Sequence, residues 1–245
     1  MTVYLVGAGP GHPELISVRG ARLLGSADVV LHDRLARPLL EHASADATII
    51  DVGKARGAAP VPQEQINRLL VEHGRRSSSV VRLKGGDPLV FARGAEEIDA
   101  LRAAGIDFEV VPGISSVLAG PTAGGIPLTR RGVSRTVTVV SGHDGPGDWP
   151  PGYAEGLVAL RGTIVVVMGA AGMAGIAARL IEAGLEPTTP VVAVRAAATE
   201  AQENRRATVA TIEQALMGPP TVFVIGDVGA LGFGGDTDLV ATPGL

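Results

Sequence analysis

Glycine-rich turns follow three short apolar segments of this chain and could bring main-chain atoms close to a ligand. They are Gly7-Ala8-Gly9-Pro10-Gly11-His12, Gly85-Gly86-Asp87-Pro88 and Pro112-Gly113. Because glycine has no Cβ, a backbone of this kind can approach a bound molecule closely. In the second turn, Asp87 adds a carboxylate that can accept hydrogen bonds from amino or hydroxyl groups. The turns therefore predict a small-molecule site, although each could also be a plain tight turn.

The first turn partly matches the fingerprint of a dinucleotide-binding site. Asp33 follows it at about the ~20-residue spacing at which that fingerprint places an acidic residue. The third glycine of G-x-G-x-x-G is replaced by His12, and Pro10 removes a backbone donor that a pyrophosphate would use. An NAD(P)-dependent oxidoreductase that uses the turn from Gly7 to Gly11 therefore stands as an alternative of a different class.

Asp33 and Lys54 could share proton transfer. Each comes just after an expected strand, so both should project from the same edge of a sheet. A carboxylate and an amine so placed could accept and donate protons, but they could equally form an ordinary surface salt bridge. His12 and His32 have no partner at a metal-pair spacing, so we predict no metal site.

Short, nearly continuous apolar runs must position these groups, as expected of parallel strands covered on both faces. Glycine stops and helical periodicity mark the segments between them. The expected strands are residues 3–6, 28–31, 48–52, 79–83, 108–111, 136–140, 163–168, 190–194, 207–211 and 221–225. The expected helices are residues 18–24, 38–42, 63–73, 95–104, 173–183 and 212–217.

This alternation predicts an α/β protein with two lobes. The segment from Gly120 to Pro127 is dense in glycine and proline and is the best candidate for a boundary. We therefore expect an N-terminal α/β lobe over residues 1–124 and a C-terminal α/β lobe over residues 125–245. Ligands of such sheets bind at the carboxyl ends of strands, so we expect the active site in a cleft between the lobes.

Composition excludes several classes of function. The 245 residues contain no Cys, which removes disulfides, thiolate metal sites and Cys nucleophiles. With 21 basic and 25 acidic side chains, the chain lacks the basic excess of a nucleic-acid-binding protein. The N-terminus has no basic n-region, and the longest apolar stretch is broken by glycines, so neither a signal peptide nor a membrane span is expected. We predict a cytoplasmic protein.

Taken in order, the motifs resemble those of the tetrapyrrole methylase family. The resemblance covers nearly the whole chain and is carried by Gly53-Lys54, Pro62-Gln63, Arg82-Leu83-Lys84-Gly85-Gly86-Asp87-Pro88, Val111-Pro112-Gly113 and Gly125-Ile126-Pro127-Leu128-Thr129-Arg130-Arg131. It is strongest with the branch that methylates uroporphyrinogen III, in the form without the dehydrogenase and ferrochelatase region of siroheme synthases. The resemblance implies the tetrapyrrole methylase fold, with a mostly parallel sheet in the first lobe and a mixed sheet in the second.

The resemblance also implies S-adenosyl-L-methionine as cofactor and S-adenosyl-L-homocysteine as product, with no metal. Asp33 matches the family's proton acceptor and Lys54 its proton donor. The implied cofactor contacts are Pro10, Gly85, Gly86, Asp87, Val90, Ser115, Ser116, Met168 and Ala197. Ser115-Ser116 stands where the family usually has Thr-Ala, and Ala197 where it commonly has Gly; all are small. Ala58 and Ala59 replace an aromatic residue and a His, which affects substrate contacts in that loop.

The implied reaction is the transfer of two methyl groups to uroporphyrinogen III, at C2 and C7, which gives precorrin-2 for siroheme or cobalamin. This tetrapyrrole carries carboxylate arms, which guanidinium groups bind well, so Arg34, Arg130 and Arg131 are candidate substrate clamps. Solvated surface charge is the alternative for each. The family forms homodimers. A family member acting on a later precorrin, a diphthamide precursor or ribosomal RNA, and a non-catalytic nucleotide-binding or tetrapyrrole-carrying module, are further alternatives.

Overall fold

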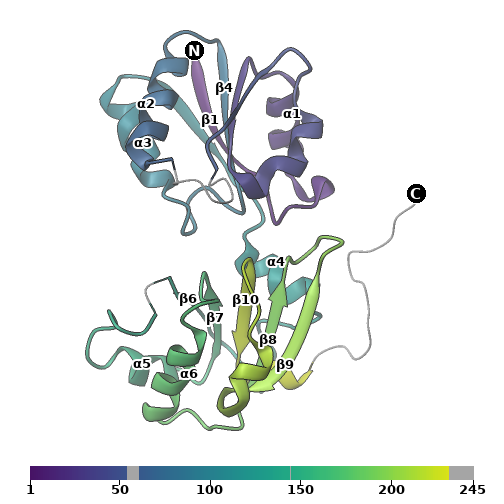
Figure 1. The fold of residues 1–245 in the computed structure, drawn as a ribbon, viewed down its shortest axis with the longest axis vertical. Helices are drawn as coiled ribbons and strands as arrows, with labels where there is room; N and C mark the ends of the chain where they lie inside the picture. The colour runs from purple at the N-terminus through teal and green to yellow at the C-terminus, as the bar shows by residue number, and fades with distance from the viewer. Residues whose placement is uncertain (54–60, 144, 232–245) are drawn as a thin grey trace. The chain divides into compact units, whose positions relative to one another are not determined.

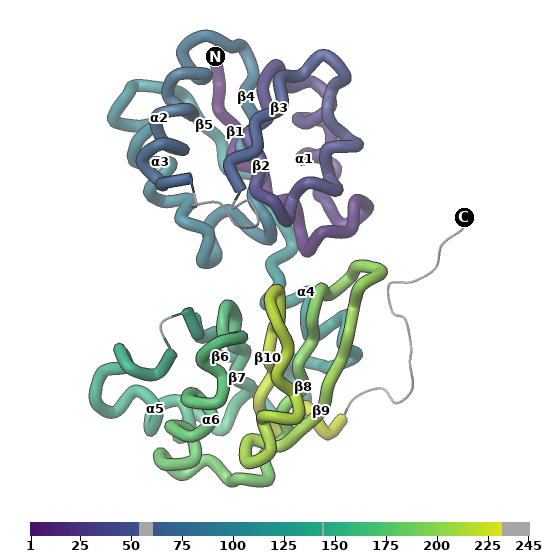
Figure 2. Tube along the Cα trace, viewed as in Figure 1, coloured from purple at the N-terminus to yellow at the C-terminus, as the bar shows by residue number. Residues whose placement is uncertain are grey.

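The computed structural model describes residues 1–53, 61–143 and 145–231. Packing divides the chain into two compact units, Met1–Ser115 and Ser116–Leu245. Each unit is built around its own five-stranded sheet. We describe the two units separately (Figures 1 and 2).

The first unit has a wholly parallel sheet, which confirms the mostly parallel sheet that was expected. Its strands, in the spatial order β3-β2-β4-β1-β5, are β1 (Thr2–Gly7), β2 (Val29–His32), β3 (Thr48–Asp51), β4 (Ser79–Lys84) and β5 (Asp107–Val111). Strand β4 lies between β2 and β1, whereas a dinucleotide-binding Rossmann sheet places β1 and β2 side by side. All carboxyl ends meet at one edge, because every pairing is parallel.

Helices cover both faces of this sheet. On one face, α2 (Gln63–Gly74) and α3 (Gly94–Ala103) bury Ile66, Leu70 and Leu101 against β1, β2 and β4 (Figure 1). On the other face, α1 (Val18–Gly25) and the 3-10 helix η2 (Arg34–His42) bury Leu24 and Leu39. A short 3-10 helix, η1 (Pro13–Leu15), precedes α1. The expected helix at 38–42 is thus the end of η2, which contains Pro38.

The second unit has a mixed sheet, as expected. Its strands, in the spatial order β6-β7-β10-β8-β9, are β6 (Val137–Ser141), β7 (Thr163–Val167), β8 (Pro190–Arg195), β9 (Glu203–Thr208) and β10 (Thr221–Ile225). Only β6 and β7 pair in parallel; the other pairings are antiparallel.

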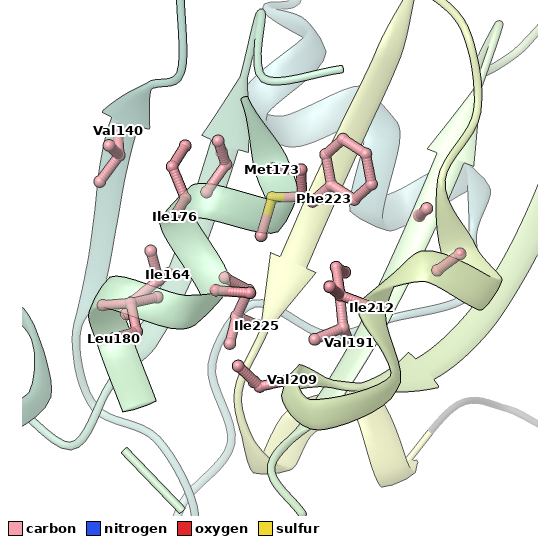
Figure 3. Packing of buried hydrophobic residues seen from close by; sticks show 14 of the residues in the cluster. Val140, Ile164, Met173, Ile176, Leu180, Val191, Val209, Ile212, Phe223 and Ile225 are labelled. Atoms are coloured by element: carbon pink, nitrogen blue, oxygen red, sulfur yellow. The ribbon is translucent and has the colours of Figure 1, made fainter. Parts of the chain in front are cut away.

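The core of the second unit lies on one face of this sheet. Figure 3 shows Met173, Ile176 and Leu180 of α6 (Met173–Glu182) packed over strand residues that include Phe223 and Ile225. Helix α5 (Tyr153–Ala159) and the 3-10 helix η3 (Val209–Ala215) complete this layer. On the opposite face lies α4 (Ser116–Ala123), and a 3-10 helix, η4 (Asp227–Leu231), ends the described chain.

The division between units lies one helix earlier than the expected boundary between residues 124 and 125. Helix α4 packs Val117 against Val165, Val167 and Val222 of the second sheet. The helix therefore belongs to the second unit, and the glycine- and proline-rich stretch lies after it. A cofactor contact expected at Ser115 ends the first unit, and one at Ser116 begins the second.

Candidate active site

At the carboxyl edge of the first sheet, the backbones of three glycine turns are in close contact with one another. They follow β1, β4 and β5, which are neighbours in the sheet. A Cβ placed on Gly7 would lie 2.5 Å from the Cα of Gly113 and 2.7 Å from the carbonyl oxygen of Gly86. A Cβ on Gly113 would in turn collide with that same carbonyl oxygen. Because no side chain fits at these positions, backbone atoms set the shape of this edge.

Hydrogen bonds fix the turns to one another. Gly9 and Gly86 exchange two backbone bonds of 3.2 and 2.8 Å. The Asp87 carboxylate accepts from the backbone N–H of Leu89 at 2.9 Å through Oδ1 and from that of Gly113 at 3.1 Å through Oδ2. Asp87, predicted as a ligand acceptor, therefore also ties the second turn to the third.

The second turn leaves space for a ligand at Gly85. The nearest atom to a Cβ built there is the Leu35 Cβ at 3.6 Å, so the position is not closed by main chain. Val90, another predicted cofactor contact, is exposed on the loop after this turn, next to the exposed Leu89 and Phe91. Pro10 is half-buried in the first turn. The predicted contacts Pro10, Gly85, Gly86 and Asp87 thus lie on two turns that are hydrogen-bonded to each other.

The first turn does not have the geometry of a dinucleotide site. That site needs a helix N-terminus directly after the glycines, where the pyrophosphate binds. Here η1 follows, and α1 begins only at Val18, with the Ser17 side chain accepting from the N–H of Gly20. Together with the strand order, this argues against the oxidoreductase alternative.

Asp33 follows β2 at the same edge, and its carboxylate is held by a buried arginine. Its N–H donates to the Leu83 carbonyl at 3.1 Å, which places it beside the end of β4. Although Asp33 is the N-cap residue of η2, its side chain makes no capping bond. Instead, its Oδ1 accepts a 2.6 Å hydrogen bond from Nη2 of Arg82. The Asp33 side chain is 34% exposed and that of Arg82 only 3%.

A fully buried carboxylate, Glu97 of α3, connects this pair to the rest of the unit. Glu97 Oε1 accepts from Arg82 Nε at 3.0 Å and from the Gln63 amide at 3.2 Å. The Lys84 ammonium donates to both Glu97 oxygens at 2.9 Å. Arg82 and Lys84 alternate along β4 and therefore point to the same face of the sheet. We call Asp33, Arg82, Lys84 and Glu97 the charge network.

The charge network shifts the ionisation of its two cations in opposite directions. Burial alone would lower the pKa of the Arg82 guanidinium, but the charges of Asp33 and Glu97 outweigh burial and raise that pKa above its ordinary value. Burial, and then the charge of Arg82, lower the pKa of the Lys84 ammonium, while Glu97 acts against them. Arg82 is thus a permanent cation.

The sequence analysis gave no role to Arg82, Lys84 or Glu97. The available signal was a pair of cations at alternate positions in an otherwise apolar strand, which needs a buried anion. Lys54, the predicted proton donor, lies outside the described residues, as do Ala58 and Ala59. The turn before Lys54 packs closely: a Cβ on Gly53 would lie 2.9 Å from the Arg34 Cβ.

The three predicted substrate arginines are all exposed. Arg34 opens η2 directly after Asp33. Arg130 and Arg131 lie in the second unit, in a turn closed by an Arg130 N–H to Ser134 carbonyl bond of 3.0 Å. Together with Thr129, Ser134 and Arg135, they line a depression of about 480 Å³. The structure therefore brings Arg130 and Arg131 together and places Arg34 beside Asp33.

The predicted cofactor contacts of the second unit lie at two strand ends. Met168 follows β7 with a left-handed φ of 56° and is 46% exposed. Ala197 follows β8 between two left-handed residues, Ala196 and Ala198. The Gln202 side chain closes this second turn, because its Oε1 accepts from the Ala198 N–H and its amide donates to the Ala123 carbonyl, each at 2.9 Å. Ser116 is the first residue of α4.

The two histidines considered in the sequence analysis, His12 and His32, make local contacts. His12 Nδ1 accepts from the Glu14 N–H at 3.3 Å, and His32 Nδ1 lies 3.1 Å from the Asp33 carbonyl oxygen. No group of three or more His, Asp or Glu side chains that could hold a metal ion occurs within residues 1–53, 61–143 and 145–231. In the same residues, no helix has the length and apolar character needed to cross a membrane.

Comparison with known proteins identifies the relatives of this chain. The family model described as Tetrapyrrole (Corrin/Porphyrin) Methylases matches residues 2–213. The chain belongs to the tetrapyrrole methylase family. The siroheme synthase of Azotobacter vinelandii is 46% identical over 233 residues, which cover 92% of this chain and 50% of that protein. The chain thus spans about half the length of the curated relatives it matches.

Solved structures of tetrapyrrole methylases have the same fold. A uroporphyrin-III C-methyl transferase from Thermus thermophilus, crystallised with S-adenyl homocysteine, matches with a TM-score of 0.81 and 38% identity over 94% of this chain and 100% of its own. A cobalt precorrin-4 methyltransferase matches with a TM-score of 0.82 and 27% identity over 93% of this chain and 95% of its own. The family and fold expected from the sequence are therefore confirmed.

Proposed function

We propose that this chain catalyses the S-adenosylmethionine-dependent C-methylation of uroporphyrinogen III at C2 and C7, which gives precorrin-2 and S-adenosylhomocysteine. The observation that carries the proposal is the half-buried Asp33 carboxylate beside the glycine turn at Gly85, in a member of this methylase family. The similarity to the uroporphyrin-III C-methyl transferase of Thermus thermophilus, crystallised with S-adenyl homocysteine, supports this choice.

The glycine edge of the first unit suits a cofactor that must be held by main-chain atoms. Pro10, Gly85, Gly86, Asp87, Val90 and Ser115 of the first unit, and Ser116, Met168 and Ala197 of the second, are the proposed contacts. Gly85 is open to a ligand, and Asp87 is fixed in place by two backbone N–H groups. A carboxylate oxygen can accept more than one hydrogen bond, so Asp87 retains acceptor capacity for an amino or hydroxyl group.

Bound S-adenosylmethionine supplies a methyl group already activated on a sulfonium, so the chain has to orient the substrate and remove a proton. Asp33 is the proposed proton acceptor. Its Oδ1 is occupied by Arg82, and within the described residues no hydrogen bond involves Oδ2. Addition of the methyl group would leave the pyrrole as a cation, and the proton that this cation loses would form an O–H bond at Oδ2. Lys54 is the proposed proton donor.

The substrate's acetate and propionate groups call for cationic partners. Arg34 is the proposed clamp next to Asp33, and Arg130 and Arg131 are the proposed clamps of the second unit. Guanidinium groups bind carboxylates through paired hydrogen bonds, which fix orientation as well as charge. All three arginines are exposed, so they can reach a ligand.

Two measurements test the proposed reaction. Calorimetry with S-adenosylhomocysteine, NAD⁺ and NADP⁺ should detect binding of the first alone; binding of a nicotinamide cofactor alone would refute the methyltransferase assignment. Incubation with uroporphyrinogen III and methyl-labelled S-adenosylmethionine should give a product with two labelled methyl groups. Binding of S-adenosylhomocysteine without any labelled product would point instead to another family substrate, such as a later precorrin.

The proposed proton transfer is tested by Asp33→Asn and Lys54→Met. Both should lower kcat and leave the affinity for S-adenosylhomocysteine unchanged, because neither residue is assigned to the cofactor. Asp46→Asn, an exposed carboxylate between η2 and β3, is the matched control. If both variants kept full kcat, neither Asp33 nor Lys54 would take part in proton transfer, and the ordinary salt bridge would be the better interpretation.

We also propose that the protein is a cytoplasmic homodimer whose product serves siroheme or cobalamin synthesis. The resemblance to the family is what supports the dimer. Sedimentation equilibrium should give twice the chain mass of 24.9 kDa. A mass equal to one chain at all concentrations would refute it.

A further inference from the structure

Asp33 balances the formal charge of the three buried side chains of the charge network. Arg82, Lys84 and Glu97 are 2%, 1% and 0% exposed, and together they carry two positive charges and one negative charge. Asp33 supplies the second negative charge through its 2.6 Å bond to Arg82. Uncompensated charge is very unfavourable away from water. Asp33 therefore balances the formal charges of the three buried side chains through a direct contact with Arg82.

The same contacts fix where the Asp33 carboxylate points. The Arg82 guanidinium is planar, and each of its nitrogens has a different partner: Nη2 donates to Asp33, Nε to Glu97, and Nη1 to the Leu83 carbonyl at 3.2 Å. With all three nitrogens engaged, the guanidinium cannot turn without breaking hydrogen bonds. Asp33, which does not cap η2, takes its orientation from this fixed group.

We propose that Arg82 is a positioning residue for methyl transfer, which holds Asp33 Oδ1 so that Oδ2 faces the substrate, and that Glu97 acts through Arg82. The proposal rests on the proposed role of Asp33 as proton acceptor. Glu97 is the anchor, because it joins Arg82 to Lys84 of β4 and to Gln63 at the start of α2.

Arg82→Lys is the most informative variant, because it keeps the charge and removes the geometry. An ammonium is a point charge, whereas the guanidinium bridges two carboxylates through separate nitrogens. We expect kcat for uroporphyrinogen III methylation to fall by about tenfold or more, since misplacement of a catalytic group by ~1 Å can cost ~100-fold. KM and the affinity for S-adenosylhomocysteine should stay within about twofold.

A double-mutant cycle separates positioning from general damage. Asp33→Asn should lower kcat, and adding Arg82→Lys to Asp33→Asn should cause no further fall, because Arg82 acts only through Asp33. Arg76→Lys is the matched control: this arginine is in the same unit, is 74% exposed, and pairs with Glu72. It should leave every parameter unchanged.

The outcomes distinguish this inference from the proposed function. If Arg82→Lys keeps full kcat while Asp33→Asn is slow, the positioning role of Arg82 is overturned and Asp33 remains the proposed proton acceptor. If Asp33→Asn keeps full kcat, both the proton-acceptor role of Asp33 and the positioning role of Arg82 are overturned. A further fall in the double variant also overturns positioning. If Arg82→Lys does not fold, Gln63→Met replaces it. This variant removes one donor from Glu97 and keeps all four charges, so it should lower kcat by about threefold with unchanged KM. An unchanged kcat overturns the proposal.

Discussion

Replacing Glu97 with Gln should severely destabilise the first unit. Four hydrogen bonds of 2.9 to 3.2 Å converge on this carboxylate from Arg82, Lys84 and Gln63. An amide keeps the shape and some of the hydrogen bonds but removes the negative charge, which leaves two buried cations with Asp33 alone. Breaking a buried ion pair by removing one partner costs about 3–5 kcal/mol. With a urea m value of about 2 kcal/mol/M, the unfolding midpoint should fall by about 1.5–2.5 M.

Glu96 provides a control at the adjacent position. It lies on the same helix and also pairs with an arginine, Arg93, at 2.7 Å, but both side chains are about half exposed. Exposed ion pairs contribute little, so Glu96→Gln should leave the midpoint unchanged. Far-UV circular dichroism follows both units, whereas fluorescence of the chain's one Trp, Trp149, reports on the second. The two signals together assign the loss to a unit.

Equal unfolding midpoints of Glu97→Gln and Glu96→Gln by circular dichroism would contradict this expectation. The charges of the network also predict the effect of a compensating change. Adding Lys84→Met to Glu97→Gln removes the second uncompensated cation, so the double variant should be more stable than the sum of the two single effects predicts. A strictly additive result would mean that Lys84 and Glu97 do not interact as their 2.9 Å contacts indicate.

Three further predictions concern stability. Burial lowers the pKa of Lys84, so the folded state binds fewer protons than the unfolded state as pH rises toward 10.5. The stability of the wild type relative to Lys84→Met should therefore rise over that range in urea titrations at several pH values. A difference that does not change with pH would contradict this. Gly113→Ala should cost about 1–3 kcal/mol of stability, because the added Cβ collides with main chain. Gly156→Ala in α5 should stabilise by about 0.5–1 kcal/mol, because nothing lies within 4 Å of the added Cβ. Thermal melts that rank the two variants in the opposite order would contradict this. Gln202→Met should cost about 1–3 kcal/mol, because two backbone groups lose their partner, and an unchanged melting temperature would show that water replaces the amide.

The parts of the fold that the sequence predicted are those with strong apolar runs. All five strands of the first unit were expected. The three inner strands, β1, β2 and β4, are the most buried, as parallel strands covered on both faces should be. Strand β9 was misplaced: it is a polar edge strand, Glu203–Thr208, and the apolar residues from Val209 onward begin η3 instead. Helix α4 was not predicted, since it contains Pro121 and Gly120 and has no polar face. Helix α5 was also missed.

The sequence predicted the site residues that directly follow strands. It did not predict contacts between residues that are far apart in the sequence. Asp33 and the Gly85 turn were placed at one sheet edge from their positions after apolar runs, and the structure has them there. The partner of Asp33 was not predictable, because Arg82 is 49 residues away along the chain and reaches it across neighbouring strands. Glu97 becomes recognisable as the buried anion only when α3 is packed on the sheet.

The strand order of the first unit has a consequence for synthesis on the ribosome. Strand β1 pairs only with β4 and β5, and about 70 residues separate its end at Gly7 from the start of β4 at Ser79. At roughly 5–20 residues per second, the nascent β1 waits about 4–14 s before either partner has been made. Throughout that interval an apolar segment that becomes an inner strand of the sheet has no strand to pair with. Production of this protein should therefore depend on chaperones and on translation speed over the first unit, even where the finished fold is stable.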